Sequence, residues 1–221
     1  MKLNAKVTKG VYHLNLLPEH ISNDIFLVGD QRRVSEISKH FDRIEYQINN
    51  REFVTHTGYI GKKRISVIST GIGTDNIDIV INELDALVNT DLESGQELKE
   101  KTNLNLVRLG TSGSIQKEIN INSIVVSSYA LGIDNLMHFY ANNQFEEEIQ
   151  DAINHQLDWP TFLSKPYVYA ANKNLLNIFK DFNQGITITA PGFYAPQGRQ
   201  IRIPCAIEDL HQKMINFNHK G

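Results

Sequence analysis

Short apolar runs that lead directly into glycine or polar residues recur along the chain. Five of them are rich in β-branched residues and are bounded by residues that interrupt regular structure, a pattern typical of buried strands. Four runs cover residues 25–28, 65–69, 124–127 and 186–189, and the other carries Arg108. We therefore expect five strands, each followed by a polar turn.

Between these runs, apolar residues three and four positions apart predict helices. The predicted helices cover residues 34–40, 77–88, 142–158 and 173–182. The segment of Thr74, Asp75 and Asn76 can cap the second helix, and the third is polar enough to lie at the surface. The charged stretch 90–103 is expected to be a surface insertion.

Strands that alternate with helices indicate an α/β fold. A chain of 221 residues is long enough for one large domain with a substantial core. In α/β folds, ligands bind at the carboxyl ends of the strands, which is where the glycine-rich turns of this chain fall. These turns are the candidate site.

Composition narrows the function classes. With a net charge of −3 and no run of basic residues, the chain offers no electrostatic case for binding nucleic acid or an anionic membrane. Cys205 is the single cysteine, so no disulfide framework is expected, and the histidines lack metal-like spacing. The N-terminal residues 1–6 show no signal-peptide pattern, and no apolar run reaches membrane-spanning length. A cytoplasmic enzyme or binding protein is expected.

Arg108 stands among leucine and valine just before a loop of glycine, threonine and serine at residues 110–114. A guanidinium stays charged in a protein, so this setting demands an anionic partner or good hydrogen bonding. The loop offers backbone N–H groups and hydroxyls, with glycines that let a ligand come close. Together they indicate an oxyanion site, with phosphate as the first candidate. The same residues also fit a surface arginine before an ordinary turn, and this stretch alone leaves both interpretations open.

Three more arginines lie in or beside such loops, namely Arg33, Arg51 and Arg199. Each by itself fits a surface residue. Several guanidiniums together with a glycine N–H and a threonine hydroxyl form a strong clamp for a dianion, because charge-assisted contacts are short and often bidentate. The combination favours the anion site.

The motifs around these arginines, taken in order, resemble those of the nucleoside phosphorylases of the uridine phosphorylase type. The matching segments are residues 12–16, 29–33, 51–53, 69–73, 82–84, 108–113 and 193–199. Gln31 stands where that family usually has proline. The resemblance implies an α/β fold, a single-domain three-layer sandwich with a mixed central β-sheet flanked by helices, over residues 1–221.

The resemblance also implies that the domain is incomplete at its C-terminus. In the family, a Glu-Met-Glu motif that binds the ribose hydroxyls, a further strand and a closing helix would come after the stretch that ends at Gly221. A fragment of a longer protein, a partner chain that covers the gap and a degenerate member without turnover all stay open.

By position, the resemblance implies a phosphate site. Its residues would be Gly29, Arg33, Arg108 and Thr111, completed by Arg51 of a neighbouring subunit. The bound dianion would attack the anomeric carbon from a fixed orientation and stabilise the positive charge that develops on the sugar. Arg108 would thus have an electrostatic role in catalysis.

The resemblance further implies a nucleoside site. Ser112 and Gly113 would line the base and the ribose, and Phe193 would pack on the base. Gln197 and Arg199 would hydrogen-bond the pyrimidine ring and stabilise the negative charge on the departing base. Arg199 would therefore be the second electrostatic group in catalysis.

Self-association follows from the same resemblance. His13 would reach the ribose 5′-hydroxyl of a neighbouring subunit, so the active form would be a dimer at least, and the family suggests a hexamer. Glu52 resembles a residue that can ligate a monovalent cation such as K⁺ at the subunit interface, although Asn76 stands where the matching ligand is usually serine. No other metal and no cofactor are expected, with phosphate as co-substrate.

The implied reaction is phosphorolysis of a pyrimidine nucleoside, in which uridine and phosphate give uracil and ribose 1-phosphate, as in pyrimidine salvage. A purine-type phosphorylase or a nucleosidase is the alternative of the same class. A non-catalytic remnant that binds nucleoside or phosphate is the alternative of another class, because the ribose-binding segment is missing. A dinucleotide-binding oxidoreductase is disfavoured, since no strand is followed by a G-x-G-x-x-G loop that opens a helix.

Overall fold

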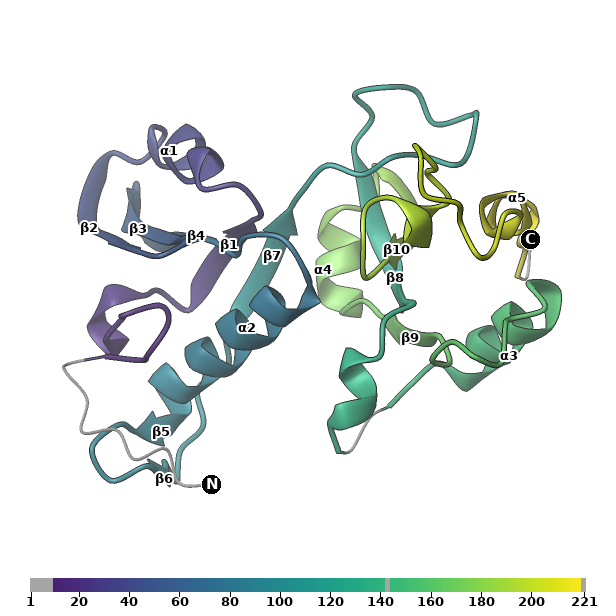
Figure 1. The fold of residues 1–221 in the computed structure, drawn as a ribbon. Coiled ribbons are helices and arrows are strands. Elements are labelled where there is room, and N and C mark those ends of the chain that lie inside the picture. The colour runs from purple at the N-terminus through teal and green to yellow at the C-terminus, as the bar shows by residue number, and fades with distance from the viewer. Residues whose placement is uncertain (1–9, 142–143, 220–221) are drawn as a thin grey trace. The chain divides into compact units, whose positions relative to one another are not determined.

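A computed structural model describes residues 10–141 and 144–219 of the chain (Figure 1). The chain forms two compact units that divide between Ser112 and Gly113. Both contain a mixed β-sheet and helices, in agreement with the expected α/β class. The sequence-based expectations for residues 1–6, for residues 142–143 and for the last two residues lie outside the described part.

The first unit is built on a five-stranded sheet with the strand order β2-β3-β4-β1-β7. Its strands are β1 Asp24–Val28, β2 Arg43–Asn50, β3 Phe53–Ile60, β4 Lys63–Ser69 and β7 Asn105–Leu109. Its helices are η1 Pro18–His20, α1 Arg32–Ser38 and α2 Thr74–Asn89. β1 pairs in parallel with β4 and β7, whereas β3 is antiparallel to both β2 and β4. The three parallel strands match the predicted runs, and the β2–β3 hairpin is an addition.

Helices of the first unit pack on both faces of this sheet. Leu84 of α2 is buried in one core with Leu27 of β1. Val34 of α1 is buried in a second core with Val28, the next residue of β1. Successive side chains of a strand point to opposite faces, so β1 contributes to both cores.

α2 begins differently from its prediction. Gly73 holds the N-cap position with φ of 104°, and no side chain caps the helix there. This backbone conformation favours glycine. Thr74, Asp75 and Asn76 form the first turn of the helix itself, so the expectation that they cap it is wrong.

The charged stretch after α2 forms a short hairpin of β5 (Thr90–Asp91) and β6 (Gln96–Glu97). Asn89, the buried last residue of α2, is hydrogen-bonded to the backbone of Thr102 near the end of this stretch. Its Nδ2 donates to the Thr102 carbonyl oxygen at 3.2 Å, and its Oδ1 accepts from the Thr102 N–H at 2.7 Å. The stretch expected as a surface insertion is therefore tied to the helix at both ends.

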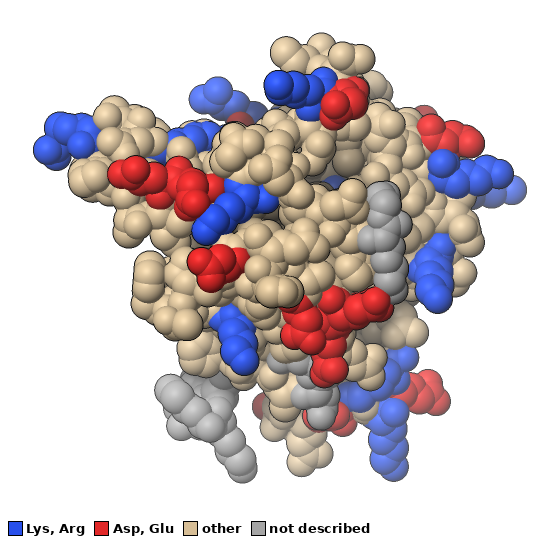
Figure 2. Space-filling model, turned by 90° about the vertical axis from the view of Figure 1, so that its right-hand side faces the viewer, with Lys and Arg blue, Asp and Glu red and all other residues tan. Residues whose placement is uncertain are grey.

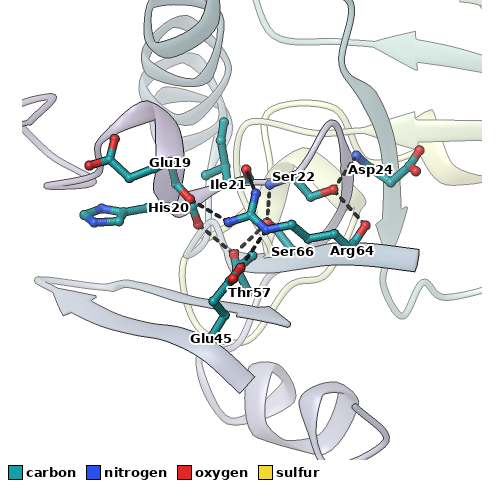
Figure 3. A network of polar contacts seen from close by, with 9 residues as sticks. All are labelled: Glu19, His20, Ile21, Ser22, Asp24, Glu45, Thr57, Arg64 and Ser66. Atoms are coloured by element: carbon teal, nitrogen blue, oxygen red, sulfur yellow. Dashed lines mark hydrogen bonds and ion pairs between the residues drawn. The ribbon is translucent and has the colours of Figure 1, made fainter. Parts of the chain in front are cut away.

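Arg64 of β4 fixes the segment that leads into β1 (Figure 3). Its guanidinium donates to the backbone carbonyl oxygens of Glu19 and Ile21 and pairs with the Glu45 carboxylate of β2 at 2.7 Å. Serine and threonine hydroxyls add hydrogen bonds between the same segment and strands β3 and β4. The entry into β1 is thus held to strands β3 and β4, and Arg64 links β4 to β2 beside it.

The second unit is built on a three-stranded sheet with the order β10-β8-β9. Its strands are β8 Val125–Gly132, β9 Tyr167–Ala170 and β10 Asn183–Thr189. Its helices are η2 Leu136–Phe139, α3 Glu147–Gln156, α4 Lys173–Ile178, η3 Ala195–Gln197 and α5 Leu210–Asn216. β8 runs parallel to β10 and antiparallel to β9. β8 and β10 overlap the two runs predicted in this part of the chain.

α3 contributes more to the core than a surface helix would. Its residues Ile149 and Ile153 are buried with Leu131 of β8, Val168 of β9 and Leu210 of α5. The polar composition of this segment reflects its other face, as in an amphipathic helix. The helix therefore helps to hold the second unit together.

α4 is shorter than its predicted span of 173–182. The side chain of Asn172 caps its start by accepting hydrogen bonds from the N–H groups of Asn174 and Leu175 at 2.9 and 3.3 Å. The helix ends at Ile178, because Phe179 leaves the helical conformation. The apolar pattern beyond Ile178 belongs to a turn.

A buried tyrosine and carboxylate pair links η2 to the sheet of the second unit. The Tyr167 hydroxyl donates to Oδ1 of Asp134 at 2.6 Å, and both residues are buried. The same oxygen accepts from the Leu136 N–H at 2.8 Å. Burial, with the neighbouring carboxylate as the next cause, raises the pKa of Tyr167 well above its ordinary value.

Replacing Tyr167 by phenylalanine should destabilise the second unit at neutral pH by about 1–3 kcal/mol, because the buried Asp134 carboxylate loses a donor. Unfolded tyrosine titrates near pH 10, below folded Tyr167, so the wild-type chain loses stability as the pH rises above about 10. The variant lacks this contribution, and the stability difference should therefore narrow at alkaline pH. Urea unfolding followed by the fluorescence of Trp159, the single tryptophan, measures it. A difference that does not change with pH would contradict the prediction.

Charged side chains of both signs are interspersed over the face drawn in Figure 2. Lys and Arg side chains on that face do not gather into one extended basic surface. Among the helices of the described residues, none is both long and apolar enough to cross a membrane.

Candidate functional site

The glycine-rich turns of the first unit begin at the carboxyl ends of its parallel strands. In the sheet register, Val28 of β1 stands beside Ser69 of β4 and beside Leu109 of β7. The turns that start at Gly29 and Gly110 therefore leave the sheet at the same edge. This is the edge where α/β sheets bind ligands.

The Arg108 guanidinium lies over these turns. A Cβ atom built on Gly29 would be 3.9 Å from Arg108 Nη2, and one built on Gly110 would be 2.6 Å from Arg108 Nη1. Arg33 of α1 donates from Nη2 to Oγ1 of Thr111 at 3.4 Å. The structure thus brings together Gly29, Arg33, Arg108 and Thr111, the four residues expected to bind phosphate from within one chain.

Two arginine guanidiniums, those of Arg33 and Arg108, bring positive charge to this edge. Within residues 10–141 and 144–219, neither Arg33 nor Arg108 has a carboxylate partner. The nearby Asp30 carboxylate accepts the backbone N–H of Arg32 at 2.9 Å instead. A dianion would offset the repulsion between the two guanidiniums and take up their donors. The arrangement therefore suits a dianion such as phosphate.

Arg51 occupies the turn between β2 and β3 and faces a different partner. Its Nη2 donates to the Tyr12 hydroxyl at 3.4 Å, and its guanidinium carbon lies 5.2 Å from the centre of the Tyr12 ring. Gln31, in the turn after β1, donates to the Arg51 carbonyl oxygen at 3.3 Å. Arg51 has a backbone φ of 55°, which is uncommon for a residue other than glycine. Among the described residues, the contacts of Arg51 are thus with Gln31 and Tyr12, not with the four residues expected to bind phosphate.

His13 is held by Glu83 of α2. The Glu83 carboxylate accepts the His13 N–H at 2.9 and 3.0 Å, the Leu14 N–H at 2.8 Å, and a hydrogen bond at 2.6 Å from Nδ1 of the His13 ring. The Tyr12 ring meets the His13 ring edge to face at 4.7 Å. Asn50 of β2 donates to the His13 carbonyl oxygen at 2.6 Å. Both the backbone and the ring of His13 are therefore fixed.

Glu83 has no role in the sequence-based expectations, although it contacts both the backbone and the ring of His13. The resemblance includes its segment, residues 82–84, but implies no role for it. The position of Glu83 on α2 could have indicated a role. It is three residues after Val80 and four before Leu87, and both of these residues are buried. An acid on the apolar face of a helix calls for donors, and the segment of His13 supplies them.

The expected base-reading loop of the second unit is a compact group around η3. The Arg199 guanidinium lies 4.2 Å from the centre of the Phe193 ring and donates to the Phe193 carbonyl oxygen at 3.0 Å. The same Nη1 is hydrogen-bonded to Oε1 of Gln197, whose Nε2 donates to the Gly192 carbonyl oxygen at 3.1 Å. A Cβ atom on Gly113 would be 3.5 Å from Arg199 Nη2. Phe193, Gln197, Arg199 and Gly113 are thus brought together.

This loop presents its groups to solvent. Phe193 is 62% exposed, and Gln197 and Arg199 are exposed as well. Gly198 closes the turn with φ of 67°, a conformation that glycine adopts without strain. An aromatic face beside an amide and a guanidinium suits a flat heterocycle with carbonyl oxygens. Ser112, the remaining expected nucleoside ligand, is exposed at the end of the first unit.

The candidate cation residues converge at Gly71. A Cβ atom on Gly71 would be 2.5 Å from Asn76 Nδ2 and 3.3 Å from Glu52 Cγ. The Asn76 amide nitrogen, however, is a hydrogen-bond donor to the Ile72 carbonyl oxygen at 3.2 Å, whereas a hard cation needs oxygen ligands. These residues fit a cation poorly. Within residues 10–141 and 144–219, no group of three or more His, Cys, Asp or Glu side chains could hold a metal ion.

A family model and several known phosphorylases match this chain. A family model, the phosphorylase superfamily, matches residues 24–216. The uridine phosphorylase of Haemophilus influenzae is 32% identical over 133 residues, 59% of this chain and 47% of that protein. The DeoD-type purine nucleoside phosphorylase of Buchnera aphidicola is 26% identical over 197 residues, 83% of this chain and 78% of that protein. The chain spans about half the length of the uridine phosphorylases that it matches from Haemophilus influenzae and Treponema pallidum.

Among solved structures, a Trypanosoma brucei nucleoside phosphorylase that shows uridine phosphorylase activity is similar, with a TM-score of 0.84 and 26% identity. The match covers 96% of this chain and 77% of that one. The expected α/β fold with a mixed sheet and the resemblance to proteins of the uridine phosphorylase type are therefore confirmed.

Proposed function

Because the chain belongs to the phosphorylase superfamily, we propose that it catalyses the phosphorolysis of a pyrimidine nucleoside. A phosphate oxygen bonds to the anomeric carbon of uridine while the bond from that carbon to N1 of the base breaks, giving ribose 1-phosphate and uracil. The observation that carries the proposal is the pair of guanidiniums of Arg33 and Arg108, which lie beside Gly29 and Thr111 and have no carboxylate partner in the part of the chain that the structure describes.

In this proposal, the first unit binds and orients phosphate. Arg33 and Arg108 hold the dianion by charge-assisted hydrogen bonds, and the Thr111 hydroxyl and the Gly29 turn complete its coordination. Fixing the nucleophile converts a bimolecular encounter into an oriented one. The bound negative charge also stabilises the positive charge that develops on the ribose ring. Neither a metal ion nor a covalent intermediate takes part in this step.

Arg199, Gln197 and Phe193 act on the leaving group in this proposal. The electron pair of the broken bond moves onto the uracil ring, where Arg199 and Gln197 stabilise the negative charge by hydrogen bonds to ring atoms. Phe193 packs on the face of the base, while Ser112 and Gly113 line the base and the ribose. The departing uracil anion then takes a proton from solvent.

We also place self-association in the proposal. Arg51 and His13 would serve the site of a neighbouring subunit, Arg51 on phosphate and His13 on the ribose 5′-hydroxyl, so the active form is a dimer at least and a hexamer by analogy with the family. In its own chain, the Arg51 guanidinium contacts Tyr12 rather than the four residues proposed to bind phosphate. K⁺ at the interface and a cytoplasmic location stay predictions.

The test is product release from uridine with and without phosphate. Purified full chain should release uracil only when phosphate is present, with one ribose 1-phosphate for each uracil, as measured by chromatography. Uracil released equally without phosphate would indicate hydrolysis and contradict the proposal. No uracil release, together with a rise in melting temperature on adding phosphate, would show a non-catalytic phosphate-binding protein instead.

Purine nucleosides are the second candidate, because the purine nucleoside phosphorylase of Buchnera aphidicola is among the relatives. The same assay with inosine decides between the two. A kcat/KM for inosine above that for uridine would assign the purine class. The group of Phe193, Gln197 and Arg199 favours the pyrimidine.

A further inference from the structure

We propose that Glu83 is a positioning residue that fixes the protonation pattern and orientation of His13, so that His13 Nε2 accepts a hydrogen bond from the ribose 5′-hydroxyl. The inference deepens the proposed function and rests on it for the identity of the hydroxyl. The contacts that carry it all lie within the first unit.

The carboxylate of Glu83 grips His13 at two places. Oε1 accepts the His13 N–H at 2.9 Å and faces Nδ1 of the ring at 2.6 Å, while Oε2 accepts the Leu14 N–H at 2.8 Å. The Glu83 side chain is only 15% exposed, against 29% for that of His13. One largely buried acid thereby anchors both the backbone at which the ring begins and the ring itself.

The chemistry of the carboxylate decides which ring nitrogen carries the proton. An ionised carboxylate only accepts hydrogen bonds, so the His13 nitrogen that faces it, Nδ1, must be the donor. In neutral imidazole, the other nitrogen then carries the lone pair, and the partner of one nitrogen sets the role of the other. His13 Nε2 is thus prepared to accept from a hydroxyl. Without Glu83, either nitrogen could carry the proton.

The surroundings of His13 support this assignment. The Tyr12 ring packs edge to face on the imidazole at 4.7 Å, and Asn50 holds the His13 carbonyl oxygen. Arg64 anchors the following segment to the sheet through Glu19 and Ile21 (Figure 3). The ring is therefore held in one place, and the nitrogen that does not face Glu83 is the one left for a ligand.

The first test compares uridine with 5′-deoxyuridine, which lacks the hydroxyl, in the Glu83→Gln variant. The amide oxygen of glutamine can keep the backbone contacts, while its NH₂ group donates to Nδ1 and moves the ring proton to Nε2. We expect kcat/KM for uridine to fall about tenfold, the effect of one lost hydrogen bond, and kcat/KM for 5′-deoxyuridine to stay unchanged. Equal losses for both substrates would overturn the proposal, because a purely structural defect does not depend on the substrate hydroxyl.

Two further variants sharpen this comparison. Glu93→Gln makes the same change at an exposed position of the first unit and should alter neither substrate. His13→Ala should reproduce the loss for uridine, and adding Glu83→Gln to it should cause no further loss. An additional loss in the double variant would show that Glu83 acts other than through His13.

The second test needs no activity. In the ¹⁵N spectrum of the histidine rings, assigned with the His13→Ala variant, wild-type His13 should show a protonated Nδ1 and an unprotonated Nε2, and Glu83→Gln should reverse the pattern. A wild-type signal with the proton on Nε2 would overturn the inference. If uridine is not a substrate, this spectrum still tests Glu83, so failure of the proposed function and failure of the inference are distinguishable.

Discussion

Replacing Arg108 by alanine is expected to lower kcat/KM for uridine phosphorolysis by about 100- to 1,000-fold, the usual loss when one donor aimed at transition-state charge is removed. Folding should be little affected, because Arg108 is exposed and has no carboxylate partner among the described residues. Initial rates over a range of phosphate concentrations, together with the melting temperature, measure both effects. The melting temperature of the variant should also respond less to phosphate.

The matched control for Arg108→Ala is Arg32→Ala, which removes an exposed arginine next to Arg33. Arg32 has no assigned role, so this variant should keep wild-type kinetics. Arg108→Lys should fall between wild type and Arg108→Ala, since lysine keeps the charge but loses the planar fork of donors. A similar loss in Arg32→Ala and Arg108→Ala would show that only the general positive field matters, and would contradict the role given to Arg108.

Replacing Phe53 by alanine is expected to lower the free energy of unfolding of the first unit by about 3–5 kcal/mol, the usual cost of truncating a fully buried phenylalanine. Phe53 is 1% exposed and packs in the core that contains Leu27 and Leu84. Urea unfolding followed by far-ultraviolet circular dichroism measures the change.

The same substitution should also weaken the site, because Phe53 directly follows Arg51 and Glu52. The Ser69 hydroxyl holds this stretch by donating to the Glu52 carbonyl oxygen at 2.9 Å and accepting the Val54 N–H at 2.7 Å. The cavity left by the Phe53 side chain should loosen the turn that carries Arg51. Phe139→Ala is the control. The side chain of Phe139 is 79% exposed, so this substitution should change the free energy of unfolding by no more than about 0.5 kcal/mol. Equal destabilisation by both substitutions would refute the prediction.

The buried parallel strands could be predicted because their apolar runs are continuous. β1 places Leu27 on one core and Val28 on the other, so both faces need apolar residues. The β2–β3 hairpin could not be predicted in this way. β2, Arg43–Asn50, is largely exposed, so its residues carry little hydrophobic pattern, and pairing with β3 defines the strand.

Some residues of the candidate site could likewise be predicted from the sequence, and others could not. Gly29, Arg108 and Thr111 could be proposed from the sequence because strand ends and glycine turns are local features that meet at one edge of a sheet. The role of Glu83 could not, since it depends on contact with His13, 70 positions away along the chain. An acid on an apolar helix face signals that some donor must come near it, but it does not say which.

The left-handed backbone conformation of Arg51 costs the folded chain free energy. A residue with a side chain gives up about 1–2 kcal/mol in this conformation relative to its preferred ones, whereas glycine adopts it freely. Arginine is thus a costly occupant of the turn between β2 and β3, where its φ is 55°. Strained residues of this kind gather at functional sites, where the surrounding structure holds them. Glycine at residue 51 would relieve this backbone strain, so the guanidinium stands at this place at a cost in conformational energy.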